Sequence, residues 1–187
     1  MNGKPLISLA PQAIQRNFSV NLVSHFHTIQ AFLPAMLQRP EGGTIVTISS
    51  ILGNLGASHL SDYTAAKAGL IAMHISLNQE LAAMRNSPEA YPGISNIRTV
   101  LVKPGQLSTP LFEGVETPSS FFGPVVPPDY LAEKIVTIID TGINGVIAEP
   151  FYARHIEWMA VLPYGLQRVA RWASGIDKAM SGFGNKK

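Results

Sequence analysis

The sequence predicts an α/β fold in which parallel strands alternate with long helices. Residues at about 44–50 and 96–102 are rich in β-branched and aliphatic side chains, the pattern of strands buried on both faces. A helical pattern at about 62–85 separates them, and a strand, a helix and a second strand of this kind form a right-handed parallel unit. A third, shorter strand is predicted at about 145–148.

Other elements follow from the same kinds of pattern. Residues 1–10 form a short lead-in, and a long helical pattern opens at Pro11. Its apolar residues are spread around the helix, so we expect this helix to be buried on much of its surface. A proline-containing loop over 86–95 follows the second helical pattern, and a further helix begins at Asp129.

The composition is that of a globular protein with one domain. The chain has 187 residues, of which 46% are hydrophobic and 14% charged, enough for a substantial core. It contains no cysteine, which excludes a disulfide framework, thiol catalysis and thiolate metal sites. No uncharged apolar run reaches the roughly 18 residues that span a bilayer, and the first residues lack the apolar core of a signal peptide. We therefore expect a cytoplasmic protein.

Positive charge is concentrated at the carboxyl end. Residues 151–187 contain six lysines and arginines and two acidic residues, a net charge of +4. The net charge of the whole chain is +2, so residues 1–150 have a net charge of −2. This distribution argues against a general nucleic-acid surface. From Tyr152 to about Ala173 a helical pattern, interrupted at Pro163, interleaves tryptophans with arginines, which fits peripheral contact with a membrane surface. Docking on the rest of the domain, or on a second subunit of a homodimer, is the alternative.

The candidate chemistry lies around Ser50, Tyr63 and Lys67. Tyr63 and Lys67 are four residues apart at the start of a helix, so they share one face; Ser61 and Asp62 are both suitable N-cap residues for it. Tyrosine ordinarily titrates near pH 10, and a lysine ammonium about 4 Å away would lower that pKa toward neutrality. Ser50 ends the first strand, at the edge where open parallel sheets bind ligands, and its hydroxyl could hydrogen-bond the same substrate oxygen.

A Tyr-x-x-x-Lys pair alone is a weak motif, but here it belongs to a longer pattern. The strand ends in Ser-Ser, a Gly-x-x-Gly connector follows at 53–56, and the tyrosine opens the run Tyr-Thr-Ala-Ala-Lys-Ala-Gly. This combination resembles the short-chain dehydrogenase/reductase family over about residues 3–180. The resemblance implies a Rossmann-type doubly wound parallel sheet. It also implies that Ser50 is the catalytic serine, Tyr63 the acid/base, and Lys67 the residue that also holds the nicotinamide ribose.

The same resemblance implies an oxidoreductase that uses NAD or NADP and acts on a CH–OH group. Its fourth catalytic residue would be Asn21, which stands in an Asn-x-x-Ser setting and would position a water for a proton relay. The alternative for Asn21 is a polar core residue whose amide is bonded to the backbone.

Two segments after the second strand are implied to contact the coenzyme and the substrate. The turn at 104–109 resembles the family's Pro-Gly turn that faces the nicotinamide, although an ordinary strand-to-loop turn is the alternative. Its implied coenzyme contacts, in addition to Tyr63 and Lys67, are Pro104, Gly105, Leu107 and Thr109. Residues 110–128 match the substrate loop, and their aromatic content favours an apolar alcohol or ketone such as a steroid, a retinoid or another lipid. The aromatic residues concerned, for which core packing is the alternative, are Phe112, Phe121 and Phe122.

No glycine-rich phosphate turn occurs in the sequence. A dinucleotide fold has a first strand that leads into a Gly-x-x-x-Gly-x-Gly turn. We therefore expect residues 1–187 to form a single incomplete domain, the C-terminal part of the family's sheet, with strand 44–50 left as an apolar edge. Two functions stay open: the oxidoreductase activity, or a catalytically inactive chain that associates with a partner or a membrane through residues 151–187. That tail resembles the retinol and 17β-hydroxysteroid dehydrogenase branch, many of whose members sit on endoplasmic reticulum or lipid droplets.

Other chemistries have little support. His25 and His27 are two residues apart on a helix and point to different sides, so they make a poor metal pair. His59 lies in the connector near the proposed site, where a histidine is most often solvated. The sequence has no Gly-x-Ser-x-Gly elbow and no P-loop. Because the chain has no cysteine and His25 and His27 make a poor metal pair, we predict no metal site.

Overall fold

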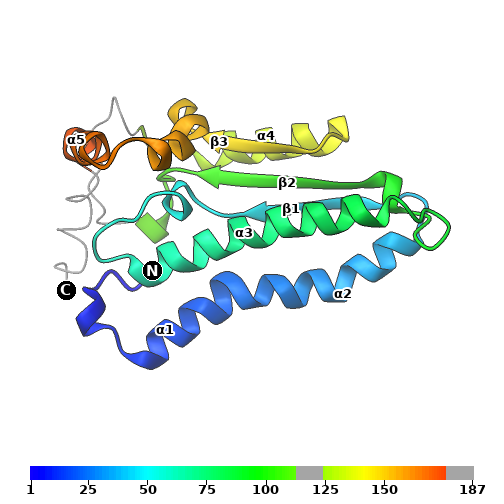
Figure 1. Cartoon of the computed structure of the whole chain (residues 1–187), viewed down its shortest axis with the longest axis horizontal. Coiled ribbons are helices and arrows are strands. Elements are labelled where there is room, and N and C mark those ends of the chain that lie inside the picture. The colour runs from blue at the N-terminus through cyan, green and yellow to red at the C-terminus, as the bar shows by residue number, and fades with distance from the viewer. Residues whose placement is uncertain (113–123, 176–187) are drawn as a thin grey trace.

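The fold is built on a parallel sheet. The computed structural model describes residues 1–112 and 124–175. Within them three strands pair in the order β1-β2-β3 (Figure 1): β1 (Gly43–Ile48), β2 (Ile97–Pro104) and β3 (Gly145–Glu149). Both pairings are parallel, with Val46 opposite Val100. The predicted α/β class and the three predicted strands are confirmed.

Helices cover both faces of this sheet. They are α1 (Pro11–Phe18), α2 (Ser24–Gln38), α3 (Ser61–Met84) and α4 (Pro128–Thr141). Alternate residues of a strand point to opposite faces. Ile97 of β2 accordingly packs with Leu77 and Leu81 of α3, whereas Val100 packs with Leu131 of α4. The core therefore consists of two layers, one on each side of β2.

A continuous helical run carries the chain from Pro11 to Gln38. A π-helical turn, η2 (Ser19–Val23), joins α1 to α2. The predicted helix is confirmed, but the expectation that much of its surface is buried is wrong. Val20, Phe26 and Phe32 are all exposed. In the described part of the chain α3 packs along one side of this run, and the apolar residues on its other sides have no covering element (Figure 1).

Strand β1 is the edge of the sheet, as predicted. It pairs with β2 on one side, and within residues 1–112 and 124–175 no strand pairs with its other side. Ile48, the last residue of β1, is exposed, and Ile45 and Val46 are only half-buried. An apolar edge of this kind is open to further strand pairing.

The described residues that follow β3 lie at one end of the sheet (Figure 1). It contains a 3₁₀ segment, η6 (Phe151–Val161), and a helix, α5 (Tyr164–Ser174), separated at Pro163 as predicted. Lys103, near the end of β2, forms an ion pair with Glu157 of η6. Figure 1 shows α5 at the end of the molecule toward which the strands point. In the described residues no helix is both long enough and apolar enough to cross a bilayer.

Element boundaries differ from the prediction where hydrogen bonds decide them. The first strand stops at Ile48, whereas β2 continues to Pro104 because it pairs there with Glu149 of β3. Helix α3 begins at Ser61 with Leu60 at the N-cap, so neither Ser61 nor Asp62 has the predicted N-cap position. Short 3₁₀ turns complete the described elements: η1 (Leu6–Ser8), η3 (Ile51–Gly53), η4 (Ile94–Asn96) and η5 (Pro110–Phe112).

Gly93 is a point at which the fold tolerates no side chain. Its backbone N–H donates to the carbonyl of Leu37, and a Cβ there would lie 2.4 Å from the carbonyl oxygen of Met36 and 2.3 Å from that of Arg39. Because these obstacles are backbone atoms, we expect Gly93→Ala to destabilise the fold by about 1–3 kcal/mol or more in urea unfolding. Gly56→Ala is the control, since no atom lies within 4 Å of a Cβ at that position. Equal stability of the two variants would contradict the predicted close packing.

Candidate active site

Ser50, Tyr63 and Lys67 lie together at the carboxyl end of β1. Ser50 follows the strand, and the first turns of α3 supply Tyr63 and Lys67. The backbone between them is held firmly: the Ser49 hydroxyl donates to the carbonyl of Lys67 at 2.8 Å. Gly53 lies against the same carbonyl, because a Cβ there would be 2.9 Å from its oxygen. The structure therefore brings the three predicted residues to one place.

The hydroxyl of Ser50 joins two parts of the site. It accepts a hydrogen bond from the backbone N–H of Leu52 at 3.1 Å and donates to the carbonyl of Pro104 at 3.4 Å. Ser50 is buried. Its side chain thus connects the end of β1 with the Pro-Gly turn that ends β2.

Tyr63 has an apolar environment. Its ring packs against Leu60, with Leu52 and Ala57 of the connector beside it. This burial raises the pKa of the phenol, and a side-chain hydrogen bond with Ser50 acts in the opposite direction. The net shift of the Tyr63 pKa is therefore opposite to the expected lowering, because desolvation of the phenolate dominates.

Lys67 is a buried cation without a carboxylate partner in the described part of the chain. Its ammonium donates to the carbonyl of Ile48 at 3.0 Å and lies 5.8 Å from the centre of the Tyr63 ring. Burial lowers the pKa of this ammonium. An ammonium has three N–H donors; the described structure pairs one of them, so two remain for oxygen atoms of a bound ligand.

Asn21 occupies the π-helical turn between α1 and α2. Its side-chain amide donates to the carbonyl of Asn17 at 3.1 Å and also to the Asn17 side chain. This geometry agrees with the backbone-bonded alternative, and π turns often mark functional sites. The turn packs against α3 two residues beyond Lys67, since a Cβ on Gly69 would lie 2.9 Å from the Leu22 side chain.

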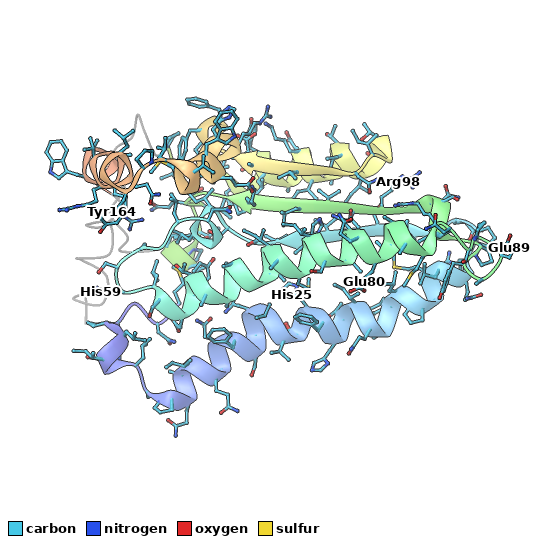
Figure 2. The ribbon with its side chains drawn as sticks, viewed as in Figure 1. His25, His59, Glu80, Glu89, Arg98 and Tyr164 are labelled. Atoms are coloured by element: carbon cyan, nitrogen blue, oxygen red, sulfur yellow. The ribbon has the colours of Figure 1, made fainter. Side chains whose placement is uncertain are left out.

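His25 is a neighbour of the site that the sequence reasoning missed. It stands one helical turn after Asn21, on the side of α2 that faces α3 (Figure 2). Burial lowers the pKa of His25, and the positive charge of Lys67 adds to this effect. The four-residue spacing from Asn21 to His25 was the available signal, because such residues share a helix face.

The Pro-Gly turn is fixed from both sides. The Gly105 N–H donates to the carbonyl of Glu149 at 2.6 Å, and the Val126 N–H donates to that of Gln106 at 2.8 Å. Leu107 pairs with Val126 in an isolated bridge, and Thr109 is half-buried. Of the predicted substrate residues Phe112 is half-buried, whereas Phe121 and Phe122 lie outside the described residues.

Three buried polar atoms in the described residues lack a hydrogen-bond partner, and all belong to segments near the site: Asn17 Nδ2, Asn54 Oδ1 and Thr64 Oγ1. Asn17 is hydrogen-bonded to Asn21, Asn54 belongs to the connector, and Thr64 follows Tyr63.

Within residues 1–112 and 124–175 no three metal-binding side chains come together. The arrangement suits proton exchange with a ligand oxygen: a phenol, a hydroxyl and an ammonium converge where parallel sheets bind ligands.

Known proteins are similar to this chain. Residues 1–119 match the family model described as short chain dehydrogenase. The chain is 39% identical over 164 residues to the uncharacterized oxidoreductase TDA5 of Saccharomyces cerevisiae, an alignment that covers 88% of this chain and 48% of that protein. It is 31% identical over 186 residues to retinol dehydrogenase 10 of Homo sapiens, with 98% and 52% covered. The chain thus spans about half the length of the curated relatives it matches.

A solved structure shows the same fold. The angucycline C-6 ketoreductase LanV, with bound NADP, matches 77% of this chain and 55% of its own with a TM-score of 0.59. The two sequences are 21% identical, so the likeness concerns the fold alone. The Rossmann-type sheet implied by the sequence is confirmed.

The burial of Lys67 predicts a stability cost with a defined pH dependence. A lysine whose folded pKa is lowered destabilises the fold at pH values below that pKa, and the cost disappears as the pH rises toward its ordinary value of about 10.5. We expect Lys67→Met to raise the melting temperature at pH 7, by an amount that shrinks as the pH rises.

Lys134→Met is the matched control with the opposite sign. Glu149 raises the pKa of Lys134, so its charge stabilises the fold below that pKa and its removal should lower the melting temperature at pH 7. A lower melting temperature of the Lys67→Met variant at every pH would contradict the predicted cost.

Proposed function

The chain belongs to the short-chain dehydrogenase family, and from this premise we propose that its site exchanges a hydride and a proton with a CH–OH group, using NAD or NADP. One observation carries the proposal. Tyr63 and Lys67 are buried next to Ser50 at the carboxyl end of β1, and Lys67 has donors left for ligand hydroxyls. The alternative that three such groups are a chance surface cluster is disfavoured, because all three are buried.

Each residue has a distinct proposed role. Tyr63 exchanges a proton with the alcohol or ketone oxygen, and the neighbouring Ser50 holds that oxygen in place. Lys67 stabilises the phenolate once Tyr63 has given up its proton. Asn21 holds a water through which the proton continues to solvent. Because burial raises the pKa of Tyr63, the phenol is protonated at neutral pH and ready to donate to a ketone oxygen.

The coenzyme would bind at the same edge of the sheet. When bound, NAD or NADP accepts or donates the hydride. The Lys67 ammonium and the Tyr63 hydroxyl would hold its nicotinamide ribose. The turn formed by Pro104, Gly105, Leu107 and Thr109 would face the nicotinamide amide. The fit is supported by the unpaired donors of Lys67 and by the fixed position of this turn, which both β3 and Val126 hold.

We propose an apolar alcohol or ketone as the substrate, of the retinoid, steroid or lipid class. The relatives support this class because they include proteins named retinol dehydrogenase 10. The apolar side chains around Tyr63 support it as well, since they would exclude water from the reacting oxygen. Phe112 would contact the substrate, together with Phe121 and Phe122.

A second candidate function is binding without catalysis. It is favoured by the exposed aromatic and aliphatic side chains of η6 and α5, among them Trp158 and Trp172. Under this hypothesis the chain associates with a partner or a membrane through this region. Coenzyme binding distinguishes the two functions.

We expect Tyr63→Phe to reduce the turnover of a retinol or steroid alcohol by about 10²–10⁴-fold, the usual contribution of a general acid or base. The substitution keeps the ring and its packing, so folding should be unaffected. Tyr91→Phe is the control, because Tyr91 packs in the core beside Leu37 and Leu81, away from the site. Equal activity of the two variants would exclude Tyr63 as the acid/base.

We expect NADH or NADPH to raise the melting temperature of the 187-residue chain. Binding to the folded state stabilises it by about 2.7 kcal/mol when the ligand is at 100 times its dissociation constant. The shift should be lost in Lys67→Met and kept in Lys134→Met. Absence of any shift with both coenzymes would favour the non-catalytic candidate.

A further inference from the structure

Side-chain hydrogen bonds join α3 to the sheet at successive places along the helix. We call them the α3 anchors: Ser49 with the Lys67 carbonyl at 2.8 Å, Thr47 with His74 at 2.9 Å, and Thr99 with Asn78 at 2.6 Å. Residues 67, 74 and 78 share a helix face because they are seven and four apart. Residues 47 and 49 are two apart, and 99 lies opposite 45, so all three side chains are on one face of the sheet.

The middle anchor is a polar pair inside an apolar layer. His74 is 3% exposed and Thr47 is 2% exposed, and the flanking Leu70 and Leu77 of α3 are buried as well. Within residues 1–112 and 124–175 the Thr47 hydroxyl makes no hydrogen bond other than the one with His74 Nδ1. A buried polar pair of this kind favours one arrangement of the helix on the strand, because any other arrangement leaves polar atoms unpaired.

The first two anchors together set the direction of α3 along β1. One holds the helix at Lys67, and the other holds it at His74, seven residues and about 10 Å further along the helix axis. A helix attached at a single point can pivot about it, whereas attachment at two points fixes its direction. Tyr63 lies one turn before Lys67, so the direction of α3 determines where the phenol stands.

We propose that His74 is a positioning residue of the candidate active site. In its neutral form it holds α3 in the direction that brings Tyr63 and Lys67 beside Ser50, and protonation of its ring loosens this attachment. His74 acts through the helix and not through contact with a substrate. Its part in the reaction rests on the proposed function, whereas the attachment of α3 does not.

The surroundings of His74 are unfavourable for a positive charge. The titratable groups on the elements around it are Lys67 on α3, Lys103 on the same face of the sheet, which is paired with Glu157, and His25 on α2. The buried acid of α3, Asp62, is twelve residues away, about 18 Å along the helix. An imidazolium has an N–H on both ring nitrogens, so Nδ1 could then no longer accept a hydrogen bond from Thr47.

This environment gives the attachment a defined pH dependence. Burial lowers the pKa of the His74 imidazole from its ordinary value of 6.5. The ring is therefore neutral in the fold at pH 7, and a loosened or unfolded chain takes up a proton there as the pH falls through 6.5. The attachment is fully present above pH 6.5 and is weakened below it.

Hydrogen exchange followed by mass spectrometry tests the attachment without coenzyme or substrate. Between pH 7.5 and 5.5, after correction for intrinsic rates, we expect the protection of residues 61–78 of the 187-residue chain to fall. The loss should reach up to about tenfold per pH unit below 6.5, the limit for one proton. Residues 128–141 of α4 should keep their protection. Constant protection of α3, or an equal loss in both helices, would overturn the proposal.

His74→Gln removes the titration and keeps a side chain that can hydrogen-bond Thr47. We expect the pH dependence of α3 protection to disappear in this variant. His27→Gln is the matched control, because His27 is an exposed histidine on α2, and it should keep the wild-type loss. An unchanged pH dependence in His74→Gln would overturn the proposal.

Two further measurements do not require His74→Gln to fold. Thr47→Ser keeps the hydroxyl and should preserve the protection of α3 at pH 7.5, whereas Thr47→Val removes the hydroxyl and should lower it. Equal protection in these two variants would overturn the proposal. In the wild-type chain the ring C–H resonances of His74 should titrate below pH 6.5, and titration at or above 6.5 would overturn it as well.

The coenzyme connects the attachment with the site. If the proposed function is correct, the rise in melting temperature with NADPH should shrink between pH 7.5 and 5.5 in the wild-type chain and persist in His74→Gln. An equal decrease in both would overturn the positioning role. Absence of a rise at any pH would contradict the proposed function, and the exchange and resonance measurements would then decide the attachment by themselves.

Discussion

The candidate site depends on the attachment of the first turns of α3 to the end of β1. The Ser49 hydroxyl binds the carbonyl of Lys67, and Gly53 brings the connector against the same carbonyl. Because Tyr63 and Lys67 lie one turn apart, holding the helix backbone at this point places both side chains. The two consecutive serines thus make different contacts. The Ser49 hydroxyl holds the backbone of α3, whereas the Ser50 hydroxyl lies in the site and donates to the carbonyl of Pro104 at the end of β2. The geometry of the site therefore comes from backbone contacts, which long side chains alone could not provide.

Burial dominates the electrostatics of this site. It raises the pKa of Tyr63 and lowers that of Lys67, so it favours the neutral form of each. A buried ammonium that binds one backbone carbonyl is expensive for the fold, and such costs are most often found where a protein has a function. His25 belongs to the same environment, since the charge of Lys67 contributes to its lowered pKa. A ligand with hydroxyl groups would offset part of this cost, because its oxygen atoms could accept hydrogen bonds from the remaining N–H groups of Lys67.

The carboxyl-terminal part follows a different physical rule from the core. In the core, alternate residues of β2 face α3 and α4, and the apolar ones are buried in both directions. In α5 the polar side is attached and the apolar side faces outward, with Arg171 as the link to the connector at Gly56. The same contact places α5 beside the segment that joins Ser50 to Tyr63. A helix with an exposed apolar side and the candidate active site are thus joined through one hydrogen bond.

The sequence by itself determined the α/β class, the three parallel strands and the meeting of Ser50, Tyr63 and Lys67. These follow from local patterns: β-branched runs, a helical period, and a four-residue spacing placed just after a strand. The tertiary structure decided what local patterns do not contain. It exposed Phe26 and Phe32 although they lie in a strongly apolar helix, and it turned Trp172 away from the protein. It also reversed the expected pKa shift of Tyr63. The physical reason is the same in each case: periodicity tells which residues share a face, but whether that face is covered, and how far a charge is desolvated, depends on segments distant in the chain.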